Sequence, residues 1–401
     1  MRRVVIVAAG RTPFGRFRGG LSEQTPQQLA AGVAESLLRG LQCEQIDQCV
    51  IGNVLSAGHG MNIARQVVRM LGLPLQTPGT TINMMCGSGL QSVSLAATAI
   101  RAGEARVVLC GGTESMSKSP LAISRPGKGA EADAAGAVDL MLCDGLQDPE
   151  SGEHMGVQTE RLAARFGISR KAQDAYAIRS QRLFARALQS GRFCSELVAC
   201  ETLEADEHPR AGVQISDLQS LRPIFAEAGS VTAGNASGIN DGAAILIVCD
   251  AEYAAERGWK PLCEWVDAVV VGCDPSEMGL GPVHAIRALM SRQDLHWSQI
   301  DRLEINEAFA AQTLACLQSL ELQLVQSGEE ADEAVTTADG TRVAFNACGG
   351  AIATGHPLAA SGARIAAHLA QEISAGVCAA TVASLCIGGG MGIAALLRKM
   401  P

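Results

Sequence analysis

Cys86 is the residue with the clearest potential for covalent chemistry. It lies in residues 80–90, where a strand-like run meets small residues and then a long helical pattern that continues to Arg101. The start of a helix offers unpaired N–H groups and the positive end of the helix dipole, which stabilise a nucleophilic thiolate. A cysteine taken at random is more often a buried core residue. Gly87 and Gly89, which let a substrate carbonyl approach the backbone, favour the nucleophile.

Two further segments offer acid–base groups. His356 stands in a glycine-lined turn that enters a second helical stretch, and the alternative is an ordinary surface histidine. Cys386 closes a strand-like run directly before residues 388–392, four of which are glycine. Such a run lets several backbone N–H groups point at one oxygen, as an oxyanion hole requires. The alternative there is an ordinary turn into the final strand.

Two polar segments can face the same site. Asn306 and Glu307 end a strand-like run and open a helix, so a side chain there can face a pocket, although an Asn N-cap is the more common explanation. Residues 231–242 offer hydroxyls, amides and glycines. They form either a structural turn or one wall of a narrow slot with a few hydrogen-bonding groups.

The elements that position these groups occur twice. Residues 45–53 are echoed by residues 299–307, and each run follows a helical stretch and leads into a strand. Residues 88–90 and 361–363 each open a helical stretch that leads to a strand and then a Gly-Gly pair. The polar, acidic residues 326–342 lack helical periodicity and are predicted to be an exposed loop insertion. The chain is therefore predicted to be a duplicated α/β unit.

The segment between the two copies has a different sequence pattern. We divide the chain into residues 1–118, an inserted region over residues 119–249, and residues 250–401. A strong amphipathic pattern over residues 157–188 predicts a helix in the insertion. In a duplicated fold the active site commonly lies between the halves, so this insertion is well placed to cover it and hold a substrate.

Composition excludes several classes of function. The net charge of -9, without a Lys/Arg cluster, argues against nucleic acid as a partner. The 14 cysteines are scattered through a long chain without Cys-x-x-Cys spacing, so we expect them to be reduced and expect no structural metal site. No apolar run reaches membrane-spanning length, and no targeting segment is visible. We therefore expect a cytoplasmic protein.

Taken together, five segments resemble the thiolase family, and the resemblance covers essentially the whole chain. Their order and spacing follow the family pattern and also fit the internal repeat. The resemblance implies an α/β fold in which two duplicated halves form a layered α-β-α-β-α core, with an inserted loop domain. The five segments are Asn83-x-x-Cys86-x-Ser88-Gly89, residues 232–242, Asn306-Glu307-Ala308-Phe309, Gly355-His356-Pro357 and Cys386-x-Gly388-Gly389-Gly390.

The resemblance also implies a ping-pong reaction between coenzyme A thioesters. Cys86, deprotonated with help from His356, takes the acyl group from one acyl-CoA, and Cys386 moves a proton at the α-carbon of the second. His356 and a water held by Asn306 then stabilise the enolate oxygen, while the N–H groups of Cys86 and Gly388 form a second oxyanion hole. Coenzyme A and acyl-CoA are substrates in this scheme, and no cofactor is expected.

Carry-over by matching segment also gives an expected coenzyme A site. Arg210 is the natural partner of the nucleotide phosphates, because a guanidinium forms bidentate bonds to phosphate, although an exposed arginine can simply be solvated. The other expected contacts are Leu146, His154, Met155, Phe225, Ala233, Ser237, Ala308 and Phe309.

The interpretation that we favour is an acetyl-CoA C-acetyltransferase, because residues 154–156 and 235–238 resemble the branch that accepts small acyl groups. The insertion at residues 326–342, and Ala359 where many relatives have glycine, depart from that branch, so a longer-chain 3-ketoacyl-CoA thiolase stays open. A ketoacyl synthase is disfavoured by Cys386. A non-catalytic lipid carrier of the same fold is disfavoured because Cys86, His356 and Cys386 are all present. Family habit implies a homodimer or homotetramer.

Overall fold

The computed structural model describes residues 2–125, 134–325 and 333–400. Its first half contains a five-stranded sheet in which β3 is parallel to β4 and β5, whereas β8 is antiparallel to β5 and β1. In spatial order the strands are β4 (Gly79–Ile82), β3 (Gln48–Gly52), β5 (Val107–Ser115), β8 (Asn240–Asp250) and β1 (Val4–Arg11).

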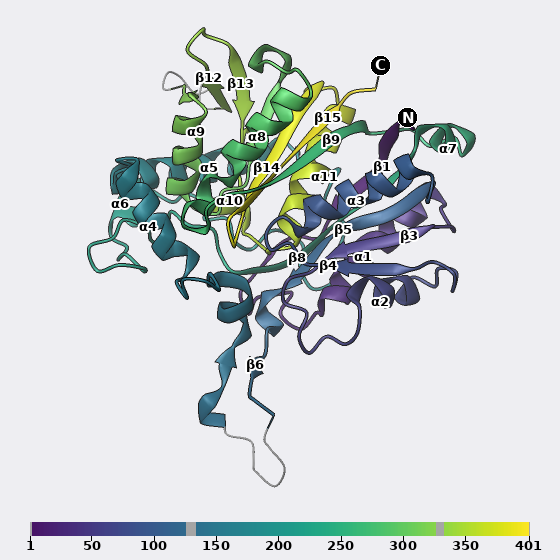
Figure 1. Cartoon of the computed structure of the whole chain (residues 1–401), viewed down its shortest axis with the longest axis horizontal. Coiled ribbons are helices and arrows are strands. Elements are labelled where there is room, and N and C mark those ends of the chain that lie inside the picture. The colour runs from purple at the N-terminus through teal and green to yellow at the C-terminus, as the bar shows by residue number, and fades with distance from the viewer. Residues whose placement is uncertain (1, 126–133, 326–332, 401) are drawn as a thin grey trace.

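The second half repeats this sheet strand for strand. Strand β10 is parallel to β13 and β14, whereas β15 is antiparallel to β14 and β9. The order is β13 (Arg342–Phe345), β10 (Arg302–Ile305), β14 (Ala380–Ile387), β15 (Met391–Arg398) and β9 (Cys263–Gly272). Pairing of β1 with β9 joins the halves, which lie side by side in Figure 1. The predicted duplication is confirmed.

The helices form three layers around these sheets. Helices α3 (Ser88–Ala102) and α11 (Ala360–Ser374) share one hydrophobic core with strands of both halves, so they form the central layer. The outer layers are α1 (Pro26–Leu41) with α2 (Ile63–Met70), and α8 (Gly281–Arg292) with α9 (Ala310–Ser319). The predicted α-β-α-β-α layering is confirmed.

Strand β8 shows how the sequence builds two cores at once. Leu246 and Val248 face the central layer, whereas Ile245 and Ile247 face the outer layer of α1 and α2. This period of two is that of a strand buried on both faces. Residues 240–249 were assigned to the inserted region, but the structure places them inside the first-half sheet, where β8 is the counterpart of β15.

The inserted region contains two helices where the sequence predicted one. The pattern over residues 157–188 forms two helices, α4 (Met155–Arg165) and α5 (Arg170–Gln189), and not one. Gly167 between them has a φ of 63°, and Ser169 caps α5 by accepting a bond from the Ala172 N–H. The amphipathic period continues across the break because both helices bury the same kind of face.

The polar stretch at residues 326–342 is also only partly a loop. Residues 326–332 lie outside the described part of the chain. Residues 334–336 form β12 (Ala334–Thr336), which pairs with β11 (Gln323–Leu324) and with β13 and so extends the edge of the sheet. Part of this stretch therefore forms short edge strands, which explains why it shows no helical periodicity.

Short elements connect these layers. They are β2 (Gly15–Arg16), β6 (Leu121–Ala122), β7 (Val138–Asp139), α6 (Ile215–Gln219), α7 (Ala251–Glu256) and α10 (Ala351–Thr354), with single turns at Met116–Lys118, Ala134–Gly136, Leu142–Leu146, Pro275–Leu280 and Trp297–Gln299. Strands β6 and β7 pair in an arm that projects away from both sheets (Figure 1). Within the described residues, no helix has both the length and the apolar character needed to cross a bilayer.

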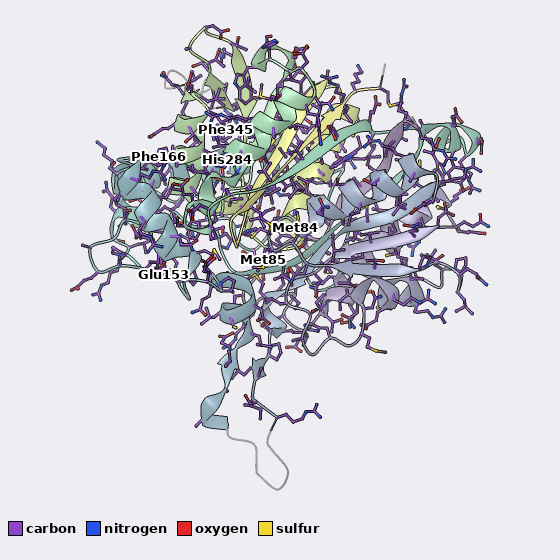
Figure 2. All side chains as sticks on the ribbon, in the orientation of Figure 1. Met84, Met85, Glu153, Phe166, His284 and Phe345 are labelled. Atoms are coloured by element: carbon purple, nitrogen blue, oxygen red, sulfur yellow. The ribbon has the colours of Figure 1, made fainter. Side chains whose placement is uncertain are left out.

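The two central helices approach each other through residues without side chains. A Cβ on Gly89 of α3 would lie 2.3 Å from the carbonyl oxygen of Ala359, just before α11, and a Cβ on Gly362 would lie 2.8 Å from the Leu90 nitrogen. Met84 and Met85, which precede α3, lie where the two halves meet (Figure 2). The N-terminal ends of α3 and α11 are thus held in close contact.

This close approach gives a first prediction. Gly89→Ala forces a methyl group against the Ala359 carbonyl, so we expect it to destabilise the protein by about 1–3 kcal/mol, as overpacking does. Gly32→Ala is the matched control, because nothing lies near that position in α1 and alanine should there stabilise the helix by about 0.5–1 kcal/mol. Thermal unfolding of both variants is the measurement. Equal effects of the two changes would contradict close helix packing.

Candidate active site

Cys86 lies on a tight turn between β4 and α3, as predicted. Met85 before it has a φ of 47°, a left-handed conformation that a non-glycine residue adopts only when its surroundings impose it. Ser88 imposes it: its Oγ accepts the Met84 N–H at 2.8 Å and donates to the Met85 carbonyl at 2.7 Å. The turn holds Cys86 at the helix start with its side chain facing a pocket.

The glycine run at residues 388–390 forms the turn between β14 and β15. Gly389 and Gly390 have φ values of 81° and 78°, so this hairpin requires glycine there. The N–H of Gly388 points at the Cys86 thiol, and so does the N–H of Cys86 itself. The run is therefore both a turn and a source of N–H groups beside the candidate nucleophile.

Burial sets the protonation of the two thiols. It raises the pKa of Cys86 to about 11, although the N–H groups of Gly388 and Cys86 oppose the rise. Burial, with the neighbouring Cys86, raises the pKa of Cys386 well above its ordinary value. The helix start was expected to favour a thiolate, but burial outweighs it. Both cysteines are neutral thiols in the free protein, so the reaction must generate the thiolate.

His356 is held in one tautomer. Its Nδ1 lies 2.6 Å from the Ser361 Oγ, and that hydroxyl donates its own hydrogen to the Pro357 carbonyl at 3.0 Å. Nδ1 must therefore carry the hydrogen, which leaves Nε2 as an acceptor. The backbone N–H of His356 is fixed by Asn240 Oδ1 at 3.0 Å. Burial lowers the pKa of His356 to about 4, so the ring is neutral at physiological pH and can accept a proton.

Asn306 lies behind this histidine and does not line the pocket. Its Nδ2 is 3.4 Å from the His356 Nε2, and its Oδ1 has no hydrogen-bond partner among the described residues. The N-cap alternative is wrong, because Phe309 occupies the N-cap position of α9. A buried amide oxygen without a partner is free to accept a bond from water, as the resemblance implies.

Glu114 is a buried carboxylate that sequence analysis missed. It accepts N–H bonds from Val54 at 3.2 Å, from Leu55 at 3.0 Å and from Ala359 at 3.1 Å. It therefore ties the segment after β3 to the segment after His356. Burial raises its pKa to about 7 against these donors. Ala359, flagged as a departure from the family, has a φ of -72° that any residue adopts.

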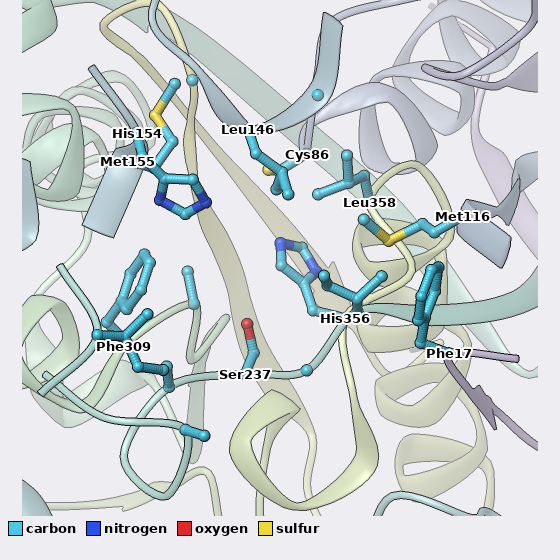
Figure 3. A pocket seen from close by; sticks show the side chains of 18 of the residues that line it. Phe17, Cys86, Met116, Leu146, His154, Met155, Ser237, Phe309, His356 and Leu358 are labelled. Atoms are coloured by element: carbon cyan, nitrogen blue, oxygen red, sulfur yellow. The ribbon is translucent and has the colours of Figure 1, made fainter. Parts of the chain in front are cut away.

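All residues expected to contact coenzyme A line one pocket with a volume of ≈ 500 Å³. Cys86, His356, Cys386 and Gly388 line the same pocket. Figure 3 shows Cys86 and His356 in it. The expected set is Leu146, His154, Met155, Arg210, Phe225, Ala233, Ser237, Ala308 and Phe309. The structure thus brings every predicted site residue together at one pocket, with Asn306 directly behind it.

Main-chain contacts build one wall of the pocket from two distant segments. The Ser237 N–H donates to the Ala308 carbonyl at 3.0 Å, and the Ala310 N–H donates to the Asn235 carbonyl at 2.9 Å. Residues 231–242 are therefore more than a local turn. Arg210 donates to the Ala233 carbonyl at 2.8 Å, so its guanidinium partly fixes this wall and is not simply solvated.

Aromatic rings line the neighbouring wall. The imidazole of His154 stacks on Phe225 with ring centres 4.6 Å apart, and Phe225 meets Phe309 edge to face at 6.2 Å. The His154 Nδ1 caps α4 by accepting the Gly156 N–H at 2.9 Å. These rings hold α4, the loop before residue 231 and the start of α9 around one slot.

Several pocket residues were not among those predicted from the sequence. Phe17, Met116, Ile239 and Leu358 form an apolar wall near Cys86, and Figure 3 shows Phe17, Met116 and Leu358 on the side away from His154. Phe17 and Met116 lie in segments without a recognisable motif, whereas Ile239 falls within residues 231–242 and Leu358 follows the His356 turn. Arg16, Met85, Gly145, His208, Ile224, Ala236, Gly238 and Met278 also line the pocket.

One cluster away from the pocket has metal-ligating side chains. Cys348, His368 and Glu372 lie close together and are buried. However, Arg302 donates to Glu372 at 2.8 Å and lies 3.0 Å from the His368 Nε2. A guanidinium thus occupies the position that a cation would take, and the cluster is an internal ion-pair network.

The raised pKa of Cys86 gives a second prediction. Because iodoacetamide reacts with the thiolate, the alkylation rate at Cys86 should rise about tenfold per pH unit between pH 7 and 9 without levelling off. Mass spectrometry of the Cys86 peptide over time gives this rate, and acetyl-CoA should slow it. A plateau at or below pH 8 would mean that the helix start overrides burial.

Comparisons with known proteins show the family of the chain. The thiolase N-terminal domain model matches residues 4–252 and the thiolase C-terminal domain model matches residues 259–399. An acetyl-CoA acetyltransferase of Syntrophomonas wolfei is 42% identical over 100% of both chains, and one of Chromobacterium violaceum is 41% identical over 99% of both.

Solved structures show the same family likeness. The acetyl-CoA acetyltransferase of Bacillus anthracis superposes with a TM-score of 0.89 at 36% identity and covers 100% of this chain and 99% of its own. Human mitochondrial 3-ketoacyl-CoA thiolase in complex with CoA superposes with a TM-score of 0.90 at 38% identity, with 100% and 98% covered. The chain belongs to the thiolase family.

Proposed function

We propose that this protein is an acetyl-CoA C-acetyltransferase, which interconverts two acetyl-CoA molecules with acetoacetyl-CoA and free coenzyme A. The observation that carries the proposal is that two thiols, Cys86 and Cys386, and the neutral imidazole of His356 share one pocket. Relatives named acetyl-CoA acetyltransferase are similar over the full length of the chain. The reaction is derived below in the direction of cleavage.

The first step makes the acyl-enzyme. The His356 Nε2 takes the proton of Cys86, and the thiolate attacks the ketone carbonyl of acetoacetyl-CoA. The oxyanion accepts hydrogen bonds from the N–H groups of Cys86 and Gly388, which already point at the sulfur. Collapse breaks the carbon–carbon bond and leaves an acetyl group on Cys86 and the enolate of acetyl-CoA.

The second step protonates that enolate. Cys386 is a neutral thiol in the free protein, so it can donate its proton to the α-carbon and become a thiolate. The protonated His356 Nε2 and a water bound to the Asn306 Oδ1 stabilise the enolate oxygen. In this scheme the raised pKa of Cys386 is an advantage, because an acid must hold its proton until the enolate forms.

The third step releases the acetyl group. The Cys386 thiolate takes the proton of incoming coenzyme A, whose sulfur attacks the thioester on Cys86. Cys86 leaves and recovers its proton from His356, which restores the starting state. The Cys86 proton returns to Cys86 through His356, and Cys386 replaces the proton that it gave to the α-carbon with the proton of coenzyme A. The residues of this chain supply each acid and base, so we propose that no cofactor takes part. Synthesis is the same sequence reversed.

A longer-chain 3-ketoacyl-CoA thiolase is the second candidate. The apolar wall of Phe17, Met116, Ile239 and Leu358 beside Cys86 offers a surface for an alkyl chain. The human mitochondrial 3-ketoacyl-CoA thiolase is also similar to this chain. The two candidates share the chemistry and differ only in the acyl group that fits.

Thiolytic cleavage of 3-ketoacyl-CoA substrates from about four to sixteen carbons separates these candidates. We expect kcat/KM to be highest for acetoacetyl-CoA and to fall with each longer chain. Loss of the ketoacyl absorbance in the presence of coenzyme A gives the rates. High activity on long chains would favour the β-oxidation enzyme, and no activity at any length would favour a lipid carrier.

Variants of the two cysteines separate the two halves of the reaction. With acetyl-CoA, Cys386→Ser should still form an acetyl adduct on Cys86 but lose at least about 100-fold in condensation, since the hydroxyl is a poorer base. Cys86→Ala should form no adduct and should keep the wild-type melting temperature. Intact-mass spectrometry and a condensation assay are the measurements. Normal condensation by Cys386→Ser would remove its role as the base.

We also propose a cytoplasmic homodimer or homotetramer, and the longer-chain candidate would place the protein in fatty-acid metabolism. All 14 cysteines are free thiols in the structure, which suits a reducing compartment. Family habit supports the oligomer.

A further inference from the structure

Helix α11 carries a buried polar stripe that continues from His356 into the core. Ser361, Arg364, His368 and Glu372 follow each other at spacings of three or four residues, so they share one face of the helix. All four are buried. The stripe begins at Ser361, whose Oγ holds the His356 Nδ1 at 2.6 Å.

The far end of the stripe is fully paired. The His368 Nδ1 lies 2.6 Å from the Glu196 carboxylate, and its Nε2 lies 3.0 Å from Arg302. Glu372 accepts bonds from Arg302 at 2.8 Å and from Arg192 at 2.8 Å. These charges therefore neutralise one another within the protein, as buried ions must.

Arg364 in the middle of the stripe is different. It is 4% exposed, and within the described residues it makes no hydrogen bond and no ion pair; its Nε is completely enclosed and without a partner. The three carboxylates whose charges act on Arg364 bind other partners. Arg302 binds Glu304 at 2.9 Å, Arg11 binds Glu196 at 2.6 Å, and Ser180 binds Glu307 at 2.6 Å. An unpaired buried charge is costly, so its retention calls for an explanation.

The charge of Arg364 acts on His356. It lies one helical turn beyond Ser361, whose hydroxyl holds the His356 ring, and its positive charge adds to burial in lowering the pKa of the histidine. No carboxylate pairs with the imidazole to oppose this effect. Glu114 on β5 and Glu307 before α9 bind the backbone N–H groups of Ala359 and Ile352, on either side of His356 in the chain. The other titratable or charged groups that line the same pocket are Cys86, Cys386, Arg16, His154, His208 and Arg210.

We propose that Arg364 is a positioning residue for the reaction, whose unpaired guanidinium keeps His356 uncharged until the imidazole receives the Cys86 proton. This inference rests on the proposed function and adds to it a residue outside the pocket. The positive charge makes the imidazolium a stronger acid, so His356 returns the proton readily to Cys86 at the end of the cycle. A carboxylate at the same place would instead raise the pKa of the imidazole and favour its charged form.

Two measurements on Arg364→Gln test the inference. The first is the titration of His356 by NMR in protein labelled with ¹³C at the histidine ring, with the signal assigned by its absence from His356→Asn. The second is the acid limb of kcat/KM for acetoacetyl-CoA thiolysis. We expect both midpoints to move up by about one to two pH units, toward the ordinary histidine value of about 6.5, so that activity at pH 5 falls about two- to tenfold relative to pH 8.

Two control variants separate the effect of the unpaired charge from other effects of substitution. Arg364→Lys retains the charge and should return both midpoints toward those of the wild type. Arg192→Gln removes a positive charge that is paired with Glu372 at the far end of the stripe, so it should leave both midpoints unchanged. Melting temperatures of all variants report any structural damage separately.

The outcomes are distinguishable. If Arg364→Gln lowers the melting temperature or the plateau rate but leaves both midpoints in place, Arg364 is only structural and the inference is wrong. If the NMR midpoint moves but the wild-type protein cleaves no 3-ketoacyl-CoA, the electrostatic role stands and the proposed function fails. A moved NMR midpoint with an unmoved acid limb would show that His356 is not the base, which also overturns the inference.

Discussion

The close approach of α3 and α11 is the constraint on which the site depends. The Ala359 carbonyl fits between Gly89 on α3 and Gly112 on β5, where any Cβ would collide with it. Because Cys86 directly precedes one helix and His356 directly precedes the other, this contact brings the nucleophile and the base to the same pocket. Larger residues at these glycines would separate the two halves, and with them the two reactive groups.

Burial then determines the protonation state of the reactive groups before substrate binds. The pocket holds two neutral thiols and a neutral imidazole with Nδ1 protonated, because no counter-charge is placed beside any of them. The three reactive groups therefore carry no charge that would have to be neutralised on binding an acyl thioester. Proton transfer occurs inside a site whose N–H groups already point at the sulfur, so little reorganisation is needed.

The polar groups of the core divide into two sets. Most buried ions pair with one another: Arg11 binds Glu196 and so ties the first half to the inserted region, and Arg302 binds Glu372 within the second half. Glu114 and Arg364 are exceptions that lie next to the His356 segment: one accepts only uncharged N–H groups and the other has no partner. Unusual electrostatics are thus concentrated where the chemistry is expected.

The duplication followed from repeats in the sequence, and the layered fold followed from the resemblance to the thiolase family that the short motifs around Cys86, His356 and Cys386 carry. The same motifs predicted the reactive residues, which the structure brings to one pocket. Sequence analysis misassigned β8 and merged α4 with α5, since hydrophobic pattern does not say which sheet a strand joins or where a helix pauses. Only the tertiary structure decided the neutral thiols, the histidine tautomer and the roles of Glu114 and Arg364. Those properties arise from contacts between segments far apart in the chain, such as Ala359 with Glu114 across 245 residues, and from burial that no local pattern records.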